Sequence, residues 1–254
     1  MRLLCSICLI LISCHSKSQQ ESVSEPSQIV NVVDVKKYKV RAHDNYSLSR
    51  QTATYIRARL KKTYDSTTDN SIRQAVLIKA EKELTNVLTS SIIPFWYGTP
   101  WDFNGYTDVP GRGDIACGYF VSTTLLHSGF NLNRYTLAQQ SGFSEAKSLC
   151  IEDSLITLEN VEAADIYKIL QDRGHQDGLY FVGLDFHVGY LLMEEGNLFF
   201  LHSNYVARQG VTIEPVEESL AFHSSVFIIV PISSNKSLIK KWLNNEPIKI
   251  VKDQ

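Results

Sequence analysis

The 254-residue sequence has no long apolar run, no excess of basic residues, and little glycine or proline. A membrane-spanning helix needs about 18 or more consecutive apolar residues, and without such a run no spanning helix is predicted. Lysine and arginine number 25 against 27 aspartates and glutamates. Proteins that grip phosphate backbones normally have a basic excess, so nucleic acid is not an expected partner. With 13 glycines, 7 prolines and 10% aromatics, the chain is predicted to be globular, not disordered.

Common site motifs are also missing. The sequence has no His-Glu-x-x-His motif, and after its N-terminal segment no paired Cys-x-x-Cys motifs, so no metal site is predicted. It also has no Gly-x-Ser-x-Gly motif and no phosphate loop. We therefore expect no metal or other cofactor, and the search for chemistry turns to individual cysteines and histidines.

The N-terminus has the pattern of a secretory signal. Arg2 precedes a short apolar stretch, residues 3–12, and Leu11-Ile12-Ser13-Cys14 resembles a bacterial lipobox. Residues 1–13 are predicted to be a lipoprotein signal peptide, Cys14 to carry the lipid, and residues 14–40 to be a flexible tether. The protein would then be anchored in a bacterial cell envelope, facing the periplasm or the surface. The alternative is an uncleaved apolar N-terminus.

This interpretation leaves two cysteines in the mature chain. Cys5 and Cys8 would be removed with the signal peptide and Cys14 would be lipidated, so Cys117 and Cys150 remain. In an oxidising envelope they are candidates for a disulfide, or one of them serves as a free thiol.

Hydrophobic periodicity predicts an α+β fold in a single domain, residues 41–234, followed by a C-terminal tail, residues 235–254. The domain includes a helical hairpin over residues 48–90, and a long aromatic loop, residues 92–114, is expected to be functional. Further helices are predicted over 116–128, 134–140 and 161–172. Strands are predicted over 178–184, 186–192, 198–203 and 226–232.

Cys117 and His187 are the candidate catalytic pair. With Asp114 as the N-cap, Cys117 would lie in the first turn of a helix, where the helix dipole favours the thiolate. A small buried side chain is the alternative for this cysteine. His187 is predicted to lie within a strand on the same face as Gly189, which leaves room for a reacting group, and His202 on the next strand is the predicted residue that orients its imidazole.

The register of the two strands decides which side chain faces His187. A four-residue loop, Met193 to Gly196, would place His202 opposite His187, whereas an intermediate register would place Asn204 there. We expect the four-residue loop, with Asn204 as the reserve orienting residue.

This order of residues resembles the NlpC-type papain-like cysteine peptidases of bacterial cell walls. Ala116-Cys117-Gly118-Tyr119-Phe120 stands where that family has Asp-Cys-Ser-Gly-Leu, and Phe95-Trp96-Tyr97-Gly98-Thr99-Pro100 resembles its aromatic-glycine segment. The resemblance implies a papain-like fold, with the nucleophile at the N-terminus of a helix that packs on a mostly antiparallel sheet. It also implies cleavage of an amide bond in peptidoglycan stem peptides through a thioester on Cys117, with His187 and His202 assisting. Ala116 and Gly118 depart from the family pattern.

Three residues of the aromatic loop are predicted to contact the substrate. The Cys117 N–H would be one oxyanion donor, and Tyr97 and Asn104 are the alternatives for a second. A turn position is the favoured alternative for Asn104. Trp101 would line the groove, or else belong to the core. Two other functions stay open. One is an inactive lipoprotein that binds wall peptides or a partner, and the other is the same catalytic trio acting on a different amide or ester.

Overall fold

The structure is a computed structural model that describes residues 45–152 and 155–253. All of these residues belong to one compact unit of the chain, Val35–Gln254. The predicted signal peptide, the lipidation site Cys14 and the tether lie outside the described residues.

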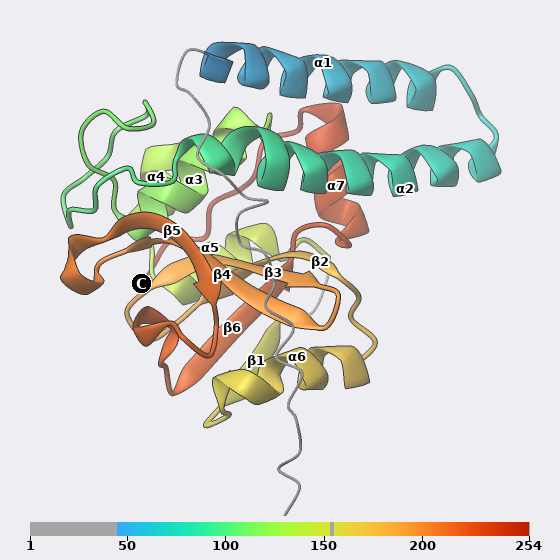
Figure 1. Cartoon of the computed structure of the whole chain (residues 1–254). Helices are drawn as coiled ribbons and strands as arrows, with labels where there is room; N and C mark the ends of the chain where they lie inside the picture. Colours follow the sequence, from blue (N-terminus) through green and yellow to red (C-terminus); the bar gives the residue numbers. More distant parts are fainter. Residues whose placement is uncertain (1–44, 153–154, 254) are drawn as a thin grey trace, which may run out of the picture. The chain divides into compact units, whose positions relative to one another are not determined.

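The predicted helical hairpin is present and consists of α1 (Tyr46–Asp65) and α2 (Asn70–Asn86), which run side by side (Figure 1). Apolar residues at helical spacing, including Ala53 and Leu84, are buried on its inner side. Asp69 caps α2 by accepting a hydrogen bond from the Ser71 N–H. α2 then passes into a π-helical turn, η3 (Val87–Ile92), and a short 3₁₀ helix, η4 (Ile93–Phe95).

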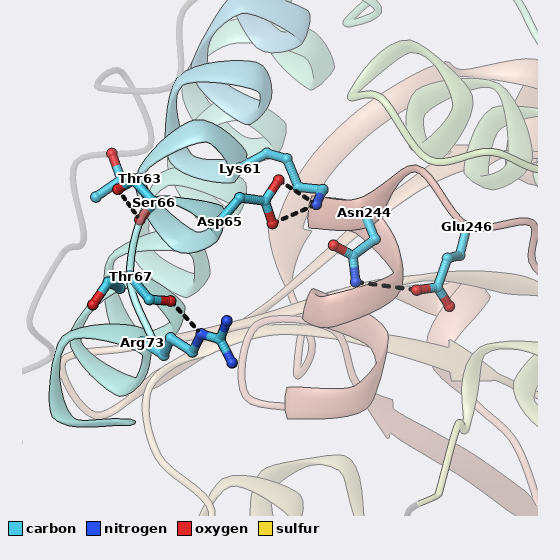
Figure 2. Close-up of polar contacts among 8 residues, drawn as sticks. All are labelled: Lys61, Thr63, Asp65, Ser66, Thr67, Arg73, Asn244 and Glu246. Carbon is cyan, nitrogen blue, oxygen red and sulfur yellow. Dashed lines mark hydrogen bonds and ion pairs between the residues drawn. The ribbon is translucent and has the colours of Figure 1, made fainter. Parts of the chain in front are cut away.

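The turn between α1 and α2 is held by local polar contacts (Figure 2). The Arg73 side chain donates to the Thr67 carbonyl at 2.9 Å, and the Ser66 hydroxyl donates to the Thr63 carbonyl at the same distance. These bonds satisfy backbone carbonyls where the helical ladder of α1 ends.

The segment predicted to be a C-terminal tail contains a further helix, α7 (Lys236–Asn244), in contact with α1 and α2. Leu238, Ile239 and Trp242 are buried, and the Trp242 indole donates to the Ser128 carbonyl at 2.9 Å. Residues 235–254 therefore pack as part of the domain, because α7 has an apolar face that another element must cover.

A six-stranded, wholly antiparallel sheet forms the second layer, with strand order β1-β6-β2-β3-β4-β5. Its strands are β1 (Ile156–Glu159), β2 (Gly178–Gly183), β3 (Val188–Glu194), β4 (Asn197–Asn204), β5 (Gly210–Pro215) and β6 (Val226–Pro231). The other helices are α3 (Cys117–His127), α4 (Arg134–Ala138), α5 (Gly142–Leu149), α6 (Ala163–Asp172), η5 (Val206–Arg208) and η6 (Leu220–Phe222). The predicted α+β class is confirmed, and β1 and β5 are additions to the four predicted strands.

Helices cover both faces of the sheet (Figure 1). Leu191 of β3 packs in the same core cluster as Ile166 and Leu170 of α6. Tyr190, its neighbour in the strand, contacts Phe120 of α3 with ring centroids 6.0 Å apart. Because adjacent residues of a strand point to opposite faces, α6 and α3 lie on opposite sides of the sheet.

The hairpin between β3 and β4 differs from the prediction. Tyr190 pairs with Leu201 and Glu194 with Asn197, so the loop has two residues instead of four. Both loop residues have positive φ, 49° at Glu195 and 84° at Gly196. This is the backbone of a type I′ turn, whose twist matches that of the flanking strands. The prediction of the four-residue loop was wrong, and the intermediate register is the one present.

Candidate active site

His187 immediately precedes β3, and its imidazole is buried against β4. Its Nε2 lies 2.8 Å from Nδ1 of His202. The two histidines therefore meet as predicted, although the register differs. In this register His202 lies opposite Gly189, two residues further along β3 and on the same face as His187.

Gly189 makes this diagonal contact possible. A Cβ atom at this position would lie 2.5 Å from the Phe200 ring and 3.0 Å from Cβ of His202. With no side chain at Gly189, β4 approaches closely enough for His202 to reach His187. Asn204, the reserve candidate, instead accepts from the Val206 N–H at 2.8 Å and donates to Gln209 at 2.9 Å. It holds the turn after β4.

A carboxylate that was absent from the sequence prediction extends the pair. Glu214 of β5 lies on the far side of His202, with Oε1 3.1 Å from the Nε2 of His202. The residue was missed because β5 was not predicted. The signal was present in Gly210-Val211-Thr212-Ile213, a glycine followed by β-branched residues, which is typical of a strand.

The charge states of Glu214, His202 and His187 determine which ring nitrogens of the two histidines carry protons. Burial lowers the pKa of His187 well below its usual value, and His202 adds to the effect. Burial also lowers the pKa of His202, although Glu214 opposes the shift. Burial alone would raise the pKa of Glu214, yet hydrogen bonding, chiefly from His202, outweighs it and lowers the pKa. At neutral pH both imidazoles are therefore uncharged and Glu214 is ionised.

An ionised Glu214 only accepts hydrogen bonds, so Nε2 of His202 carries the proton and its Nδ1 is an acceptor. Nε2 of His187 must then donate to that Nδ1, which leaves Nδ1 of His187 unprotonated. Aromatic rings hold the imidazole in place: Tyr205 lies 5.1 Å and Phe200 5.6 Å from it between ring centroids. His187 is thus oriented as a general base.

Cys117 is the first residue of α3, and the N-cap is Ala116, which has no side-chain acceptor. The prediction of Asp114 as the N-cap was wrong. The chain pairs there with the aromatic loop, where the Asp114 carbonyl accepts from Thr107 at 3.0 Å. The hydroxyl of Ser203, next to His202, donates to the Ile115 carbonyl at 2.7 Å. This bond ties the segment before Cys117 to β4.

Cys117 and His187 line one cleft of about 830 Å³. Trp101 and Asn104 line it too, as predicted for substrate contacts, whereas Tyr97 is 8% exposed and lies outside the lining. The cleft therefore brings together the candidate nucleophile, the candidate base and two of the three loop residues.

The thiol of Cys117 is uncharged at neutral pH. Burial and the nearby carboxyl of Glu145 raise its pKa to about 11, against the opposing effect of backbone N–H groups of Val188 and Gly118. The expectation that the helix N-terminus favours a resting thiolate was therefore wrong, because desolvation outweighs the helix dipole.

Glu145 of α5 explains why position 118 is a glycine. It is 1% exposed, and its Oε2 has no hydrogen-bond partner among the described residues. Burial, assisted by Asp253, raises its pKa well above the usual value, which favours the uncharged carboxyl. A Cβ at position 118 would lie 2.9 Å from Glu145 and 2.6 Å from the Ala138 carbonyl, which leaves room only for glycine.

Other features bear on the remaining alternatives. No disulfide joins Cys117 and Cys150, so the pairing considered above is not formed. Within the described residues there is no group of three or more His, Cys, Asp or Glu side chains arranged to hold a metal ion. No helix of the described part of the chain is long and apolar enough to cross a membrane.

Comparison with known proteins identifies no relative of this chain. No family model matches the chain, and no curated protein or solved structure matches it significantly.

Proposed function

We propose that the protein is a cysteine hydrolase of the cell envelope that cleaves an amide bond in peptidoglycan stem peptides. One observation carries the proposal: the hydrogen-bonded series Glu214, His202 and His187 ends in the cleft that also contains Cys117. The anchor on Cys14 and the NlpC-like identity belong to the same proposal and rest on the sequence patterns.

Because both Cys117 and His187 are uncharged in the resting site, proton transfer accompanies the attack. Nδ1 of His187 accepts the thiol proton as the sulfur bonds to the carbonyl carbon, and the resulting imidazolium then protonates the departing amine. A thioester on Cys117 remains. Water then attacks the thioester, and His187 takes the water proton. The acid product is released, and the departing Cys117 sulfur takes that proton from His187 to become the thiol again.

The oxyanion would face the open N-terminus of α3. The backbone N–H of Cys117 has no intrahelical acceptor, since it is among the first residues of the helix. Of the two candidates for a second donor, Asn104 lines the cleft and Tyr97 does not. We therefore assign the second donor to the Asn104 side-chain amide.

The raised pKa of Cys117 is the observation that favours the alternative, a lipoprotein without chemistry that binds wall peptides. A test must therefore measure turnover instead of the reactivity of the resting thiol. A neutral thiol will react slowly with iodoacetamide at pH 7 under either hypothesis.

The decisive experiment incubates the full chain with purified peptidoglycan and with free stem peptides, and identifies products by mass spectrometry. Cys117→Ala and His187→Ala should each lose at least about 10³-fold in rate, as expected for members of one catalytic unit. Cys150→Ala removes the other described cysteine and should retain activity. Products that persist in Cys117→Ala, or no products from any substrate, would refute the hydrolase.

A further inference from the structure

The cleft around Cys117 differs from the other cavities of the described structure in its charge. Three other cavities contain acidic side chains, among them Glu81, Glu162 and Asp108. The lining of the Cys117 cleft includes no Asp, Glu, Lys or Arg, although such residues make up 20% of the chain. Its walls are dominated by six aromatic residues: Trp101, Phe103, Tyr106, Tyr119, Phe186 and Tyr205.

Arg134 is a charged group behind the lining, with its guanidinium 5.6 Å from the Tyr119 ring centroid. It is 6% exposed, is not part of the lining, and donates to the Tyr106 carbonyl at 2.8 Å and the Thr123 hydroxyl at 2.7 Å. Cys117 and His187 are both uncharged at neutral pH, for the reasons given above. Glu145, the carboxyl beneath Gly118, is buried, and burial raises its pKa well above the usual value, which favours its uncharged form. A charged substrate group in this cleft would therefore lose part of its hydration without meeting an opposite charge in the lining.

The rim offers apolar surface on two sides. Phe186, in the turn before β3, is 97% exposed, and Phe103, in the aromatic loop, is 79% exposed. Covering such rings with a ligand removes apolar area from water and is a common device of ligand sites.

The polar groups of the cleft are amides. Gln140 is already engaged, since it donates to the Thr136 carbonyl and accepts from the Asp253 N–H. Gln139 uses only its NH₂ group, which donates to the Tyr119 hydroxyl at 3.3 Å, and its Oε1 faces no donor among the described residues. The Gln139 amide is uncharged, so its Oε1 can accept from a carboxamide NH₂, but the side chain supplies no charge to balance a carboxylate.

We infer that the cleft takes uncharged peptides, in which the carboxyl group beside the scissile bond is a carboxamide, and that it rejects the corresponding free carboxylates. This inference rests on the proposed function and names its substrate class. Its basis is the combination of an uncharged lining, exposed aromatic rims and an unengaged amide acceptor at Gln139.

The test uses two peptides that differ only in having a carboxamide or a carboxylate beside the scissile bond. The carboxamide peptide should have a kcat/KM at least about tenfold higher, because a carboxylate enters the cleft without a counter-charge. The same two peptides with a chloromethyl ketone at the scissile position give a second measurement, the rate at which the Cys117 sulfur displaces chloride and is alkylated. The two ketone probes should differ by a similar factor.

A charge introduced into the cleft should reverse part of the preference. Gln139→Lys should raise the relative rate for the carboxylate peptide about threefold to fivefold, the effect of one partly exposed ion pair. Gln74→Lys, at an exposed position of α2, adds the same charge outside the cleft and should leave the ratio unchanged.

The outcomes separate the two proposals. Hydrolysis of both peptides at equal rates would keep the hydrolase and overturn the inference, as would a preference for the carboxylate. Absence of hydrolysis, with the carboxamide probe captured faster, would overturn the hydrolase and support the uncharged site. Equal capture of the two probes without hydrolysis would overturn both.

Discussion

His187 and His127 are both buried, both hydrogen-bonded through a ring nitrogen and both surrounded by aromatic rings. Nδ1 of His127 lies 2.8 Å from the Tyr46 hydroxyl, and its ring stacks on Trp96. Burial lowers the pKa of His127 to about 3 and that of His187 well below its usual value. A lowered pKa therefore does not distinguish a structural histidine from a candidate catalytic one.

The two sites differ in what lies beyond each imidazole. The His127 network ends at the Trp96 indole, which donates to Tyr46 at 2.8 Å, and the aromatic rings enclose it. The His187 network ends in a carboxylate on one side and in the cleft with Cys117 on the other. Helix α3 joins them, since Cys117 is its first residue and His127 its last. We assign the candidate catalytic role to the histidine that has both a partner that orients its imidazole and access to a nucleophile.

The largest effect is expected from removing the carboxylate that distinguishes the two networks. In Glu214→Ala, Nε2 of His202 loses its acceptor, so the proton can move to Nδ1 and force the unproductive tautomer on His187. We expect kcat/KM to fall by about 10²-fold, a smaller effect than removal of His187 itself. In Glu214→Gln, the side-chain carbonyl still accepts the bond, so the loss should be about tenfold or less.

Glu218→Ala removes an exposed carboxylate from the turn after β5 and is the matched control. The pH profile separates positioning from general loss of structure, because a tautomer change alters the ionisations that govern the rate. Equal rates for Glu214→Ala and Glu218→Ala would show that the carboxylate has no part in orienting His187.

The elements with local signals could be predicted from the sequence. The helices of residues 48–90 follow from apolar residues at helical spacing. His187 and His202 could be paired because they lie on consecutive strands, where either of two registers brings them within reach. The contact was predictable even though the loop length was not. A two-residue type I′ loop needs positive φ at both positions, and Glu195 is not a residue type that indicates positive φ, whereas Gly196 is.

The rest depends on tertiary contacts. Glu214 comes from an edge strand reached through a short turn in which Ala207 and Arg208 have positive φ, and the sequence between β4 and β5 gives no strong turn signal. His127, the last residue of α3, is 5% exposed because α1 covers it with Tyr46. Desolvation of Cys117 depends on α5 placing Glu145 beneath Gly118, which no local pattern encodes.

A smaller effect, on stability alone, is expected from Tyr46→Phe. The change removes one hydroxyl and leaves both the Trp96 indole and Nδ1 of His127 without their buried partner. The free energy of unfolding should fall by about 2 kcal/mol, measured by urea denaturation. Because Tyr46 is not part of the cleft lining, kcat/KM should be retained. Tyr55→Phe, at an exposed position of the same helix, should change neither quantity.

The last effect is confined to acid pH: the pH dependence of stability that arises from His127. Its pKa is about 3 in the folded chain, below the unfolded value of about 6.5, so its contribution is complete above pH 6.5. As the pH falls from 6.5 towards 3, the unfolded state binds a proton that the folded state does not, and stability falls by at most about 1.4 kcal/mol per pH unit. His127→Gln should make urea denaturation midpoints less sensitive to acid, whereas His223→Gln removes an exposed imidazole as the control. Parallel curves for the parent and His127→Gln would mean that His127 is not buried in its neutral form. The lowered pKa values of His187 and His202 also reduce stability in acid, and they do so in the parent and in both variants. The contribution of His127 is therefore the difference between the curve of the parent and that of His127→Gln.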